Sequence, residues 1–259
     1  MKKLLYSALT ASCLLYSNAS AGVLLDAQVG AGAWMAKTSG NIAYDGGNIN
    51  LENDLGLNDS TNGYLYADIN HFVPIIPNIR IERQELKTDA TKATNVTFAS
   101  RNFGSTTKSD IDLTQNDLIL YWGIPGLNIL SAGILNVDFG INIKQYDGSI
   151  TLTDTTTNIS ESVDLDFIVP MGYLAAQINP PFIPATISAS TKMISYDGSE
   201  LSDSMIMASI DLPIPLPLID FRLDVGYKIQ KLDISKDLSD DVNGNITNKG
   251  MMLGLSAKF

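Results

Sequence analysis

Two features of this 259-residue sequence predict an all-β fold, a single antiparallel up-and-down β-barrel that spans a membrane. Apolar and polar residues alternate through much of the chain, and prolines break the alternation in clusters. Alternation with a period of two indicates strands with one apolar face and one wet face. Only 17% of the residues are charged, yet the mean hydropathy is just +0.09, which excludes a bundle of membrane helices.

The first residues have the composition of a secretory signal peptide. Lys2 and Lys3 form a positive n-region, and an apolar stretch too short to span a bilayer follows over 4–15. Ala19-Ser20-Ala21 then matches the small-x-small cleavage pattern. We therefore expect residues 1–21 to be removed after Ala21, leaving one domain over 22–259.

Turns and loops alternate along this domain. Nine of the ten prolines lie in four short breaks, and proline removes a donor from a sheet ladder, so these breaks are predicted to be tight turns. Longer segments rich in Asn, Asp, Ser, Thr and Gly lie between them. The proline breaks fall at 74–77, 125, 180–184 and 213–217, and the polar segments run over 37–60, 88–110, 147–162, 197–203 and 233–248.

Four turns and five loops divide the domain into ten strands. An even strand number, with short turns at one end and long loops at the other, is typical of bacterial outer-membrane barrels, whose short turns face the periplasm and whose longer loops are extracellular. Pro170 predicts a bulge or a later start in the sixth strand. The predicted strands are 24–36, 61–72, 78–87, 111–123, 134–146, 163–178, 185–196, 204–212, 218–232 and 249–259.

The last strand carries a more specific pattern. Apolar residues occupy alternate positions from Met251 to the final aromatic residue, Phe259. This segment resembles the C-terminal strand of outer-membrane β-barrel proteins, which the barrel-assembly machinery recognises. The resemblance implies that Leu255, Ala257 and Phe259 form the assembly signal.

Three further segments, 73–80, 116–122 and 137–148, are similar to motifs of a family of small, largely uncharacterised outer-membrane barrel proteins of Gram-negative bacteria. This resemblance implies a fold and a location in the outer membrane. The matching motifs are structural, and they bring no catalytic residues with them.

The polar face of the strands is expected to point into the barrel. A closed barrel satisfies its backbone hydrogen bonds, so its apolar faces can meet lipid. A Lys or Arg facing lipid near the midplane would cost about 2–4 kcal/mol, which places the charges inside. Ten strands leave two interpretations open: a network of salt bridges that plugs the lumen, or a hydrated path for small solutes. The lumen-facing candidates are Asp26, Gln28, Asp68, Asp138, Asn142, Lys144, Lys192, Asp220, Arg222, Asp224 and Lys228.

Catalysis has little support in the sequence. A lipid- or peptide-processing enzyme needs a base near neutral pH, usually His, and His71 is the only one. It precedes the first proline turn and shares its parity with Leu65 and Ile69, so we expect it to point outward at the periplasmic end. With one His and one Cys, no metal site is predicted, and no cofactor is expected.

The predicted function is therefore that of an integral outer-membrane barrel without catalytic activity, acting as a structural or surface-interaction protein or as a narrow passive channel. The alternatives are an outer-membrane lipid- or peptide-processing enzyme and a soluble periplasmic β-barrel that binds ligands. Expected partners are outer-membrane lipid, lipopolysaccharide and the barrel-assembly machinery, with the protein a monomer. The chain has 28 acidic and 17 basic residues, and this acidic balance excludes nucleic acid as a partner.

Overall fold

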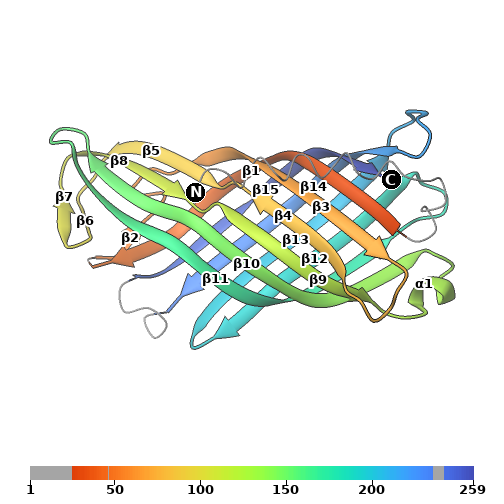
Figure 1. Cartoon of the computed structure of the whole chain (residues 1–259). Helices are drawn as coiled ribbons and strands as arrows, with labels where there is room; N and C mark the ends of the chain where they lie inside the picture. Colours follow the sequence, from red (N-terminus) through yellow and green to blue (C-terminus); the bar gives the residue numbers. More distant parts are fainter. Residues whose placement is uncertain (1–24, 46, 236–241) are drawn as a thin grey trace, which may run out of the picture.

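A computed structural model of the chain describes residues 25–45, 47–235 and 242–259, and these form a closed antiparallel barrel (Figure 1). The predicted signal peptide and its cleavage site lie outside the described residues. The elements are β1 (Leu25–Tyr44), β2 (Ile49–Asn50), β3 (Asp59–His71), β4 (Asn78–Gln84), β5 (Lys87–Ala93), β6 (Val96–Phe98), β7 (Arg101–Phe103), β8 (Thr106–Asp112), β9 (Gln115–Gly123), α1 (Leu127–Leu130), β10 (Leu135–Asp154), β11 (Ile159–Ile178), β12 (Ala185–Tyr196), β13 (Ser199–Asp211), β14 (Asp220–Ile234) and β15 (Val242–Lys258).

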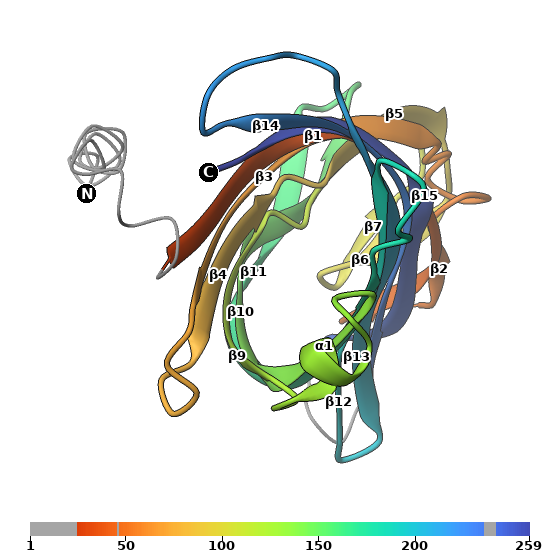
Figure 2. The same cartoon turned by 90° about the vertical axis from the view of Figure 1, so that its right-hand side faces the viewer.

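The wall of the barrel has ten strands, as the sequence predicts. Each strand pairs with its neighbours in the order β1, β3, β4, β9, β10, β11, β12, β13, β14 and β15. β15 then pairs back with β1 along most of its length, which closes the ring (Figure 2). β5 and β8 continue the lines of β4 and β9 after short breaks at 85–86 and 113–114. Closure leaves no open edge among these ten wall strands, whereas β5 in the opposite half pairs only with β8.

The two ends of the barrel differ. The proline-containing turns, 72–77, 124–134, 179–184 and 212–219, all lie at one end, which we call the proline end. The start of β1 and the end of β15 lie there too, because the number of wall strands is even. β2, β6 and β7 lie at the opposite or far end, on the left in Figure 1. Among the described residues, no helix is long and apolar enough to cross a membrane.

An apolar belt surrounds the half of the barrel nearest the proline end. In β10 the outward-facing Phe139 and Ile141 are each 50% exposed, and Leu253 in β15 is 49% exposed. Beyond the belt the same face becomes polar, with Lys249 following Met251 and Lys231 following Ile229. In β14 and β15 the belt runs over 221–229 and 251–259, nine residues each, which agrees with the 9–11 residues that a tilted strand needs to cross a bilayer.

The far half corrects the predicted loops. Of the segment 147–162, which the sequence predicts to be a loop, only 155–158 lies outside β10 and β11. Of the segment 197–203, only Asp197 and Gly198 connect β12 to β13. The strands thus continue well beyond the belt, and several loops at the far end are shorter than expected.

Pro170 causes neither the bulge nor the late start that the sequence predicts. β11 already begins at Ile159, and it pairs with β10 throughout, including the pair Ile143 with Pro170. Its ladder with β12 begins only at Gly172. Pro170 therefore lies just beyond the β12 ladder, where the missing N–H group is tolerated.

Candidate functional site: the interior of the barrel

The barrel interior consists of three layers. Nearest the proline end is an open polar cavity, which we call the cup. Next comes a set of charged side chains, the ion layer, made of Glu82, Asp117, Lys144, Lys192, Asp203 and Lys228. In the far half the interior is filled by an apolar layer. Strand register fixes this order, because each strand contributes inward-facing residues to successive layers.

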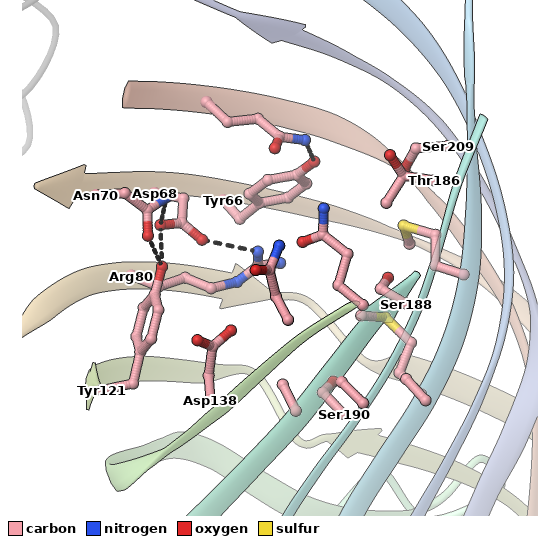
Figure 3. A pocket seen from close by; sticks show the side chains of 18 of the residues that line it. Tyr66, Asp68, Asn70, Arg80, Tyr121, Asp138, Thr186, Ser188, Ser190 and Ser209 are labelled. Atoms are coloured by element: carbon pink, nitrogen blue, oxygen red, sulfur yellow. Dashed lines mark hydrogen bonds and ion pairs between the residues drawn. The ribbon is translucent and has the colours of Figure 1, made fainter. Parts of the chain in front are cut away.

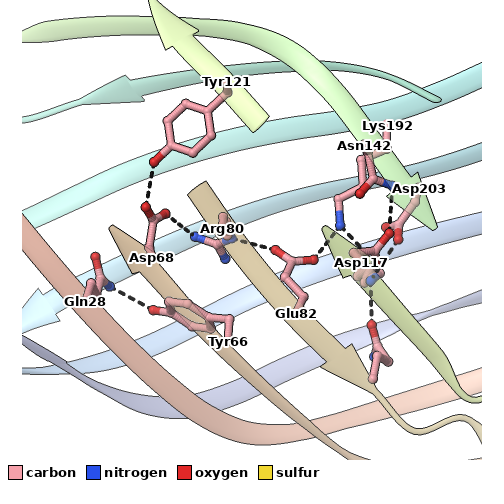
Figure 4. A network of polar contacts seen from close by, with 12 residues as sticks. Gln28, Tyr66, Asp68, Arg80, Glu82, Asp117, Tyr121, Asn142, Lys192 and Asp203 are labelled. Carbon is pink, nitrogen blue, oxygen red and sulfur yellow. Dashed lines mark hydrogen bonds and ion pairs between the residues drawn. The ribbon is translucent and has the colours of Figure 1, made fainter. Parts of the chain in front are cut away.

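The ion layer is a network of contacts among six of the ten wall strands, β4, β9, β10, β12, β13 and β14 (Figure 4). Lys144 Nζ lies 3.0 Å from both Asp117 Oδ2 and Asp203 Oδ2. Lys192 Nζ contacts Glu82 and lies 3.3 Å from Asp117 Oδ2. Lys228 Nζ lies 3.1 Å from Asp203 Oδ2, and it also donates to Gln84.

Because its side chains are buried, the ion layer forms a barrier across the lumen. The side chains of Lys144, Lys192 and Lys228 are 1–5% exposed, and those of Asp117 and Asp203 are 2–3% exposed. Three lysines face three carboxylates, so the charges balance. Buried ion pairs of this kind add little net stability, but loss of one partner leaves a charge uncompensated and is strongly destabilising.

Beyond the ion layer the inward-facing residues become apolar. Ile150 and Leu152 of β10 are 0–1% exposed, and Leu201 and Leu232 of β13 and β14 are 3–5% exposed. Trp34 lies between the two layers, with Lys228 Nζ 5.4 Å from the centre of its ring. Such a packed apolar interior excludes water from the far half.

The hairpin of β6 and β7 covers the far end. Main-chain N–H groups of Ala99 and Ser100 donate to the carbonyl oxygens of Tyr44 and Asp45 at the end of β1, over 2.9 and 2.7 Å. On the other side, Arg101 Nε lies 2.6 Å from Glu161 Oε1 in β11. β1 and β11 lie on opposite sides of the ring, so the hairpin bridges the far mouth.

The cup is the part of the interior that remains open (Figure 3). Its volume is about 320 Å³, and polar side chains from all ten wall strands line it. Tyr121 donates to Asp68 over 2.6 Å, and Arg80 Nη1 lies 3.2 Å from Asp68 Oδ2. Arg80 Nε also lies 2.6 Å from Glu82 Oε1, which links the floor of the cup to the ion layer.

One carboxylate of the cup has no partner of opposite charge. The cations that line the cup are all paired: Arg80 as above, Arg222 with Asp211 at 2.8 Å, and Lys258 with Asp26 at 2.6 Å. Asp138 forms no ion pair and no side-chain hydrogen bond among the described residues. Figure 3 shows its carboxylate pointing into the cavity. The cup can therefore accept one additional positive charge.

The structure places the predicted lumen residues in different layers. Lys144, Lys192 and Lys228 belong to the ion layer, and Asn142 donates to Asp117 over 2.7 Å beside it. Asp224 is buried and receives a 3.4 Å hydrogen bond from Tyr66. Asp220 differs, because it is exposed at the proline end and does not line the cup. The residues of the prediction that do line the cup are Asp26, Gln28, Asp68, Asp138 and Arg222.

Sequence reasoning missed Arg80, Glu82, Asp117 and Asp203, which pair with the predicted residues. β9 and β13 point odd-numbered residues inward, whereas β10 and β14 point even-numbered ones inward. The sequence does contain a signal for Asp117 and Asp203, because each is a charged residue with apolar residues close to it in the same strand. The cost of a charge facing lipid would have placed both inside.

His71 serves the first proline turn. Its Nδ1 accepts a 3.2 Å hydrogen bond from the Val73 N–H, and its Nε2 lies 3.1 Å from the Pro77 carbonyl oxygen. Since Nδ1 accepts, Nε2 carries the proton and donates to Pro77. Both ring nitrogens are thus occupied by the main chain. No group of three or more His, Cys, Asp or Glu side chains in the described part of the chain could hold a metal ion.

The residues of the predicted assembly signal face outward. Leu255 and Phe259 are 57% and 54% exposed, and Ala257 is half-buried beside them. The N–H of Phe259 donates to the Ala27 carbonyl oxygen over 2.8 Å, so the ladder with β1 reaches the last residue.

Comparison with known proteins adds only distant likenesses. No protein-family model matches the chain, and no curated protein matches it. The outer-membrane protease OmpT of Escherichia coli gives a TM-score of 0.47 at 11% identity, covering 91% of this chain and 96% of that chain. The translocator domain of the autotransporter NalP of Neisseria meningitidis gives 0.43 at 11% identity, covering 96% and 92%. Ail of Yersinia pestis gives 0.39 at 11% identity, covering 91% and 99%. These likenesses are too distant to assign a function.

Proposed function

We propose that this protein is an integral outer-membrane barrel with a closed lumen and no catalytic activity, serving a structural or surface-interaction role. The observation that carries this proposal is the combination of an apolar outer belt with an interior filled across two of its three layers. Under this proposal the proline end faces the periplasm and the far end faces the outside of the cell.

The apolar belt supports the membrane location. A water-soluble barrel buries its apolar face and exposes its polar face, but the proline half does the reverse. Large apolar side chains such as Ile206 and Leu65 are 54% and 51% exposed on its outer wall. Lipid would cover them, and the closed ring satisfies the backbone groups of the wall strands within hydrocarbon. This argues against the soluble periplasmic alternative, in which the apolar face would point inward.

Membrane fractionation tests the location. We expect the protein to sediment with the outer membrane, to require detergent for release, and to migrate faster on a gel when it is left unheated. Recovery in the soluble periplasm without detergent would overturn the proposal.

The two filled layers argue against the passive-channel interpretation. A hydrated path would have to cross side chains that are almost fully buried, and a filled interior is what a narrow barrel is expected to have. In planar bilayers we expect no steady open-channel current from the purified protein. A reproducible unitary conductance would show that the ion layer opens and would restore the channel alternative.

The environment of His71 argues against the enzyme alternative. A general base must have a free nitrogen within reach of a substrate, whereas both nitrogens of His71 bind the turn that contains it. We expect no hydrolysis of phospholipid or peptide substrates by the purified protein. Activity that disappears in His71→Ala, while the barrel still folds, would contradict this conclusion.

The proposed oligomeric state and partners follow from the closed ring and from its outer surface. A closed ring of wall strands does not need a partner to cover a sheet edge, so we propose a monomer surrounded by phospholipid and lipopolysaccharide. The outward-facing C-terminal strand, with Leu255 and Phe259 exposed, suits recognition by the barrel-assembly machinery.

A further inference from the structure

A second cavity lies between two of the proline turns. It has a volume of about 410 Å³, and the turns 72–77 and 124–134 form its walls together with the start of β10. Its lining includes the apolar side chains of Phe72, Ile76, Trp122 and Ile124 together with polar ones, among them Asn78, Asn136 and Asp138. We call this cavity the rim groove.

The rim groove adjoins the apolar belt. Trp122 stacks against Phe139 on the outer wall, with ring centres 6.4 Å apart. The turns that flank the groove expose large apolar side chains, with Ile75, Ile129 and Leu130 between 85% and 88% exposed. The belt therefore extends past the strand ends and around the mouth of the groove. An amphiphile of the surrounding membrane is the molecule best suited to occupy the groove.

The rim groove also adjoins the cup. Asn136 and Asp138 line both cavities, which places them at the boundary between the two. Asp138 is the carboxylate of the cup that has no ion-pair partner. Asn78, which lines the groove, uses its side-chain oxygen to accept the main-chain N–H of His71 over 2.9 Å, and its amide NH₂ group has no acceptor among the described residues.

We propose that the rim groove binds a phospholipid whose headgroup carries a protonated primary amine, such as phosphatidylethanolamine. The ammonium group donates to Asp138, a phosphate oxygen accepts from the Asn78 amide, and the acyl chains run along Trp122 and Phe139 into the belt. This inference rests on the proposed membrane location, with the lipid supplied by the periplasmic leaflet.

The charges of the cup favour this headgroup over an anionic one. Every cation that lines the cup already has a carboxylate partner, so no basic side chain is free to bind a negatively charged headgroup there. A quaternary ammonium has the positive charge but no N–H group, so it cannot donate to the carboxylate. We therefore expect ethanolamine headgroups to be preferred over both glycerol and choline headgroups.

The two tryptophans of the chain allow a direct test. Trp122 lines the groove, whereas Trp34 is fully buried inside the barrel. Brominated acyl chains quench only nearby tryptophans, and Trp122→Phe gives the background from Trp34. The full protein is reconstituted into phosphatidylcholine vesicles in which a fixed fraction of lipid is dibrominated, with an ethanolamine, glycerol or choline headgroup.

We expect dibromo-phosphatidylethanolamine to quench Trp122 at least about twofold more than either other lipid, as a partly exposed ion pair would give. Asp138→Asn should abolish the preference, while Asp220→Asn, a carboxylate on the opposite side of the same end, should retain it. Equal quenching by the three lipids in the natural protein would overturn the lipid site but not the membrane location. No quenching by any of them would overturn the location itself.

Discussion

The two halves of the barrel place their apolar side chains on opposite faces of the same strands. In β10, Ile141 and Ile143 of the proline half point outward and are 50% and 39% exposed. Ile150 and Leu152 of the far half point inward and are 0–1% exposed. The polar residues make the reverse change, so one strand joins a wall suited to lipid to a wall suited to water.

This inversion shows that the phase of the alternation reports the solvent on each side of the wall. Where lipid lies outside, the polar residues collect in the interior and must satisfy one another, as in the ion layer. Where water lies outside, the interior can be an ordinary apolar core. The far half thus resembles a small soluble barrel built onto a membrane-spanning one.

The largest effect should come from breaking the ion layer. Asp203→Ala removes a carboxylate that pairs with both Lys144 and Lys228. Lys228 is left without an ion pair among the described residues, and we expect a loss of about 3–5 kcal/mol in the free energy of unfolding. Urea unfolding in lipid vesicles would measure it. Asp220→Ala, at an exposed site, should change stability by less than about 0.5 kcal/mol. A similar small change for both variants would mean that the interior of the proline half is open to water.

The apolar layer should give the next largest effect. Leu152→Ala removes a fully buried side chain from the far half, and we expect it to cost about 2–5 kcal/mol. Thr151→Ala on the outer face of the same strand should cost little, because its hydroxyl bond to Ser162 is exposed. The same unfolding assay compares them. If Leu152→Ala were as mild as Thr151→Ala, the far half would not contain a dry core.

The sequence predicts the structure of the proline half better than that of the far half. The strand number, the closed ring and the inward charges Lys144 and Lys192 follow from alternation, because every strand in the belt obeys the same phase. The apolar layer does not follow from that phase. Segments such as 147–162 are rich in Thr, Asp and Ser, a composition that predicts loops. Yet Ile150 and Leu152 alternate with threonines in the opposite phase to Ile141 and Ile143, which is the signal of a strand that has left the membrane.

The pairings within the ion layer could not be predicted from the sequence, for a different reason. Charges inside the strands predict that polar residues face inward, but they do not predict which of them meet. Lys192 contacts Glu82 across the barrel, 110 residues away in the sequence. That pairing depends on the closure and stagger of the whole ring. The cup and its unpaired Asp138 are set by the same geometry, so neither could be recognised before the ring was built.

Lysine substitutions on the outer face of β10 should have a moderate effect, and they test where the belt ends. Ile141→Lys places a charge on the outer wall of the proline half, where we expect a cost of about 2–4 kcal/mol if the site lies near the midplane. Gln145→Lys makes the same kind of change on the same face of β10, two residues beyond Ile143, where the outward-facing residue of β10 is already polar. It should be close to neutral. Unfolding from vesicles measures both variants, and equal costs would contradict the proposed boundary.

The smallest effect concerns the shortest connection of the far half. Asp197 and Gly198 have φ angles of 49° and 73°, the left-handed pair that a two-residue hairpin requires. An Asp-Gly pair is a strong hairpin signal, and it marks this segment as strand continuing through a turn. Gly198→Ala forces a side chain into the left-handed region and should cost about 1–2 kcal/mol.

Gly63→Ala gives the matched control for this prediction. Gly63 lies on the outer face of β3, and the nearest atom that a new Cβ would meet is 3.9 Å away. It should be neutral or slightly stabilising, because alanine loses less entropy on folding than glycine. If Gly198→Ala were equally neutral, the turn would not depend on a left-handed glycine, and the strands of the far half would not be fixed by this hairpin.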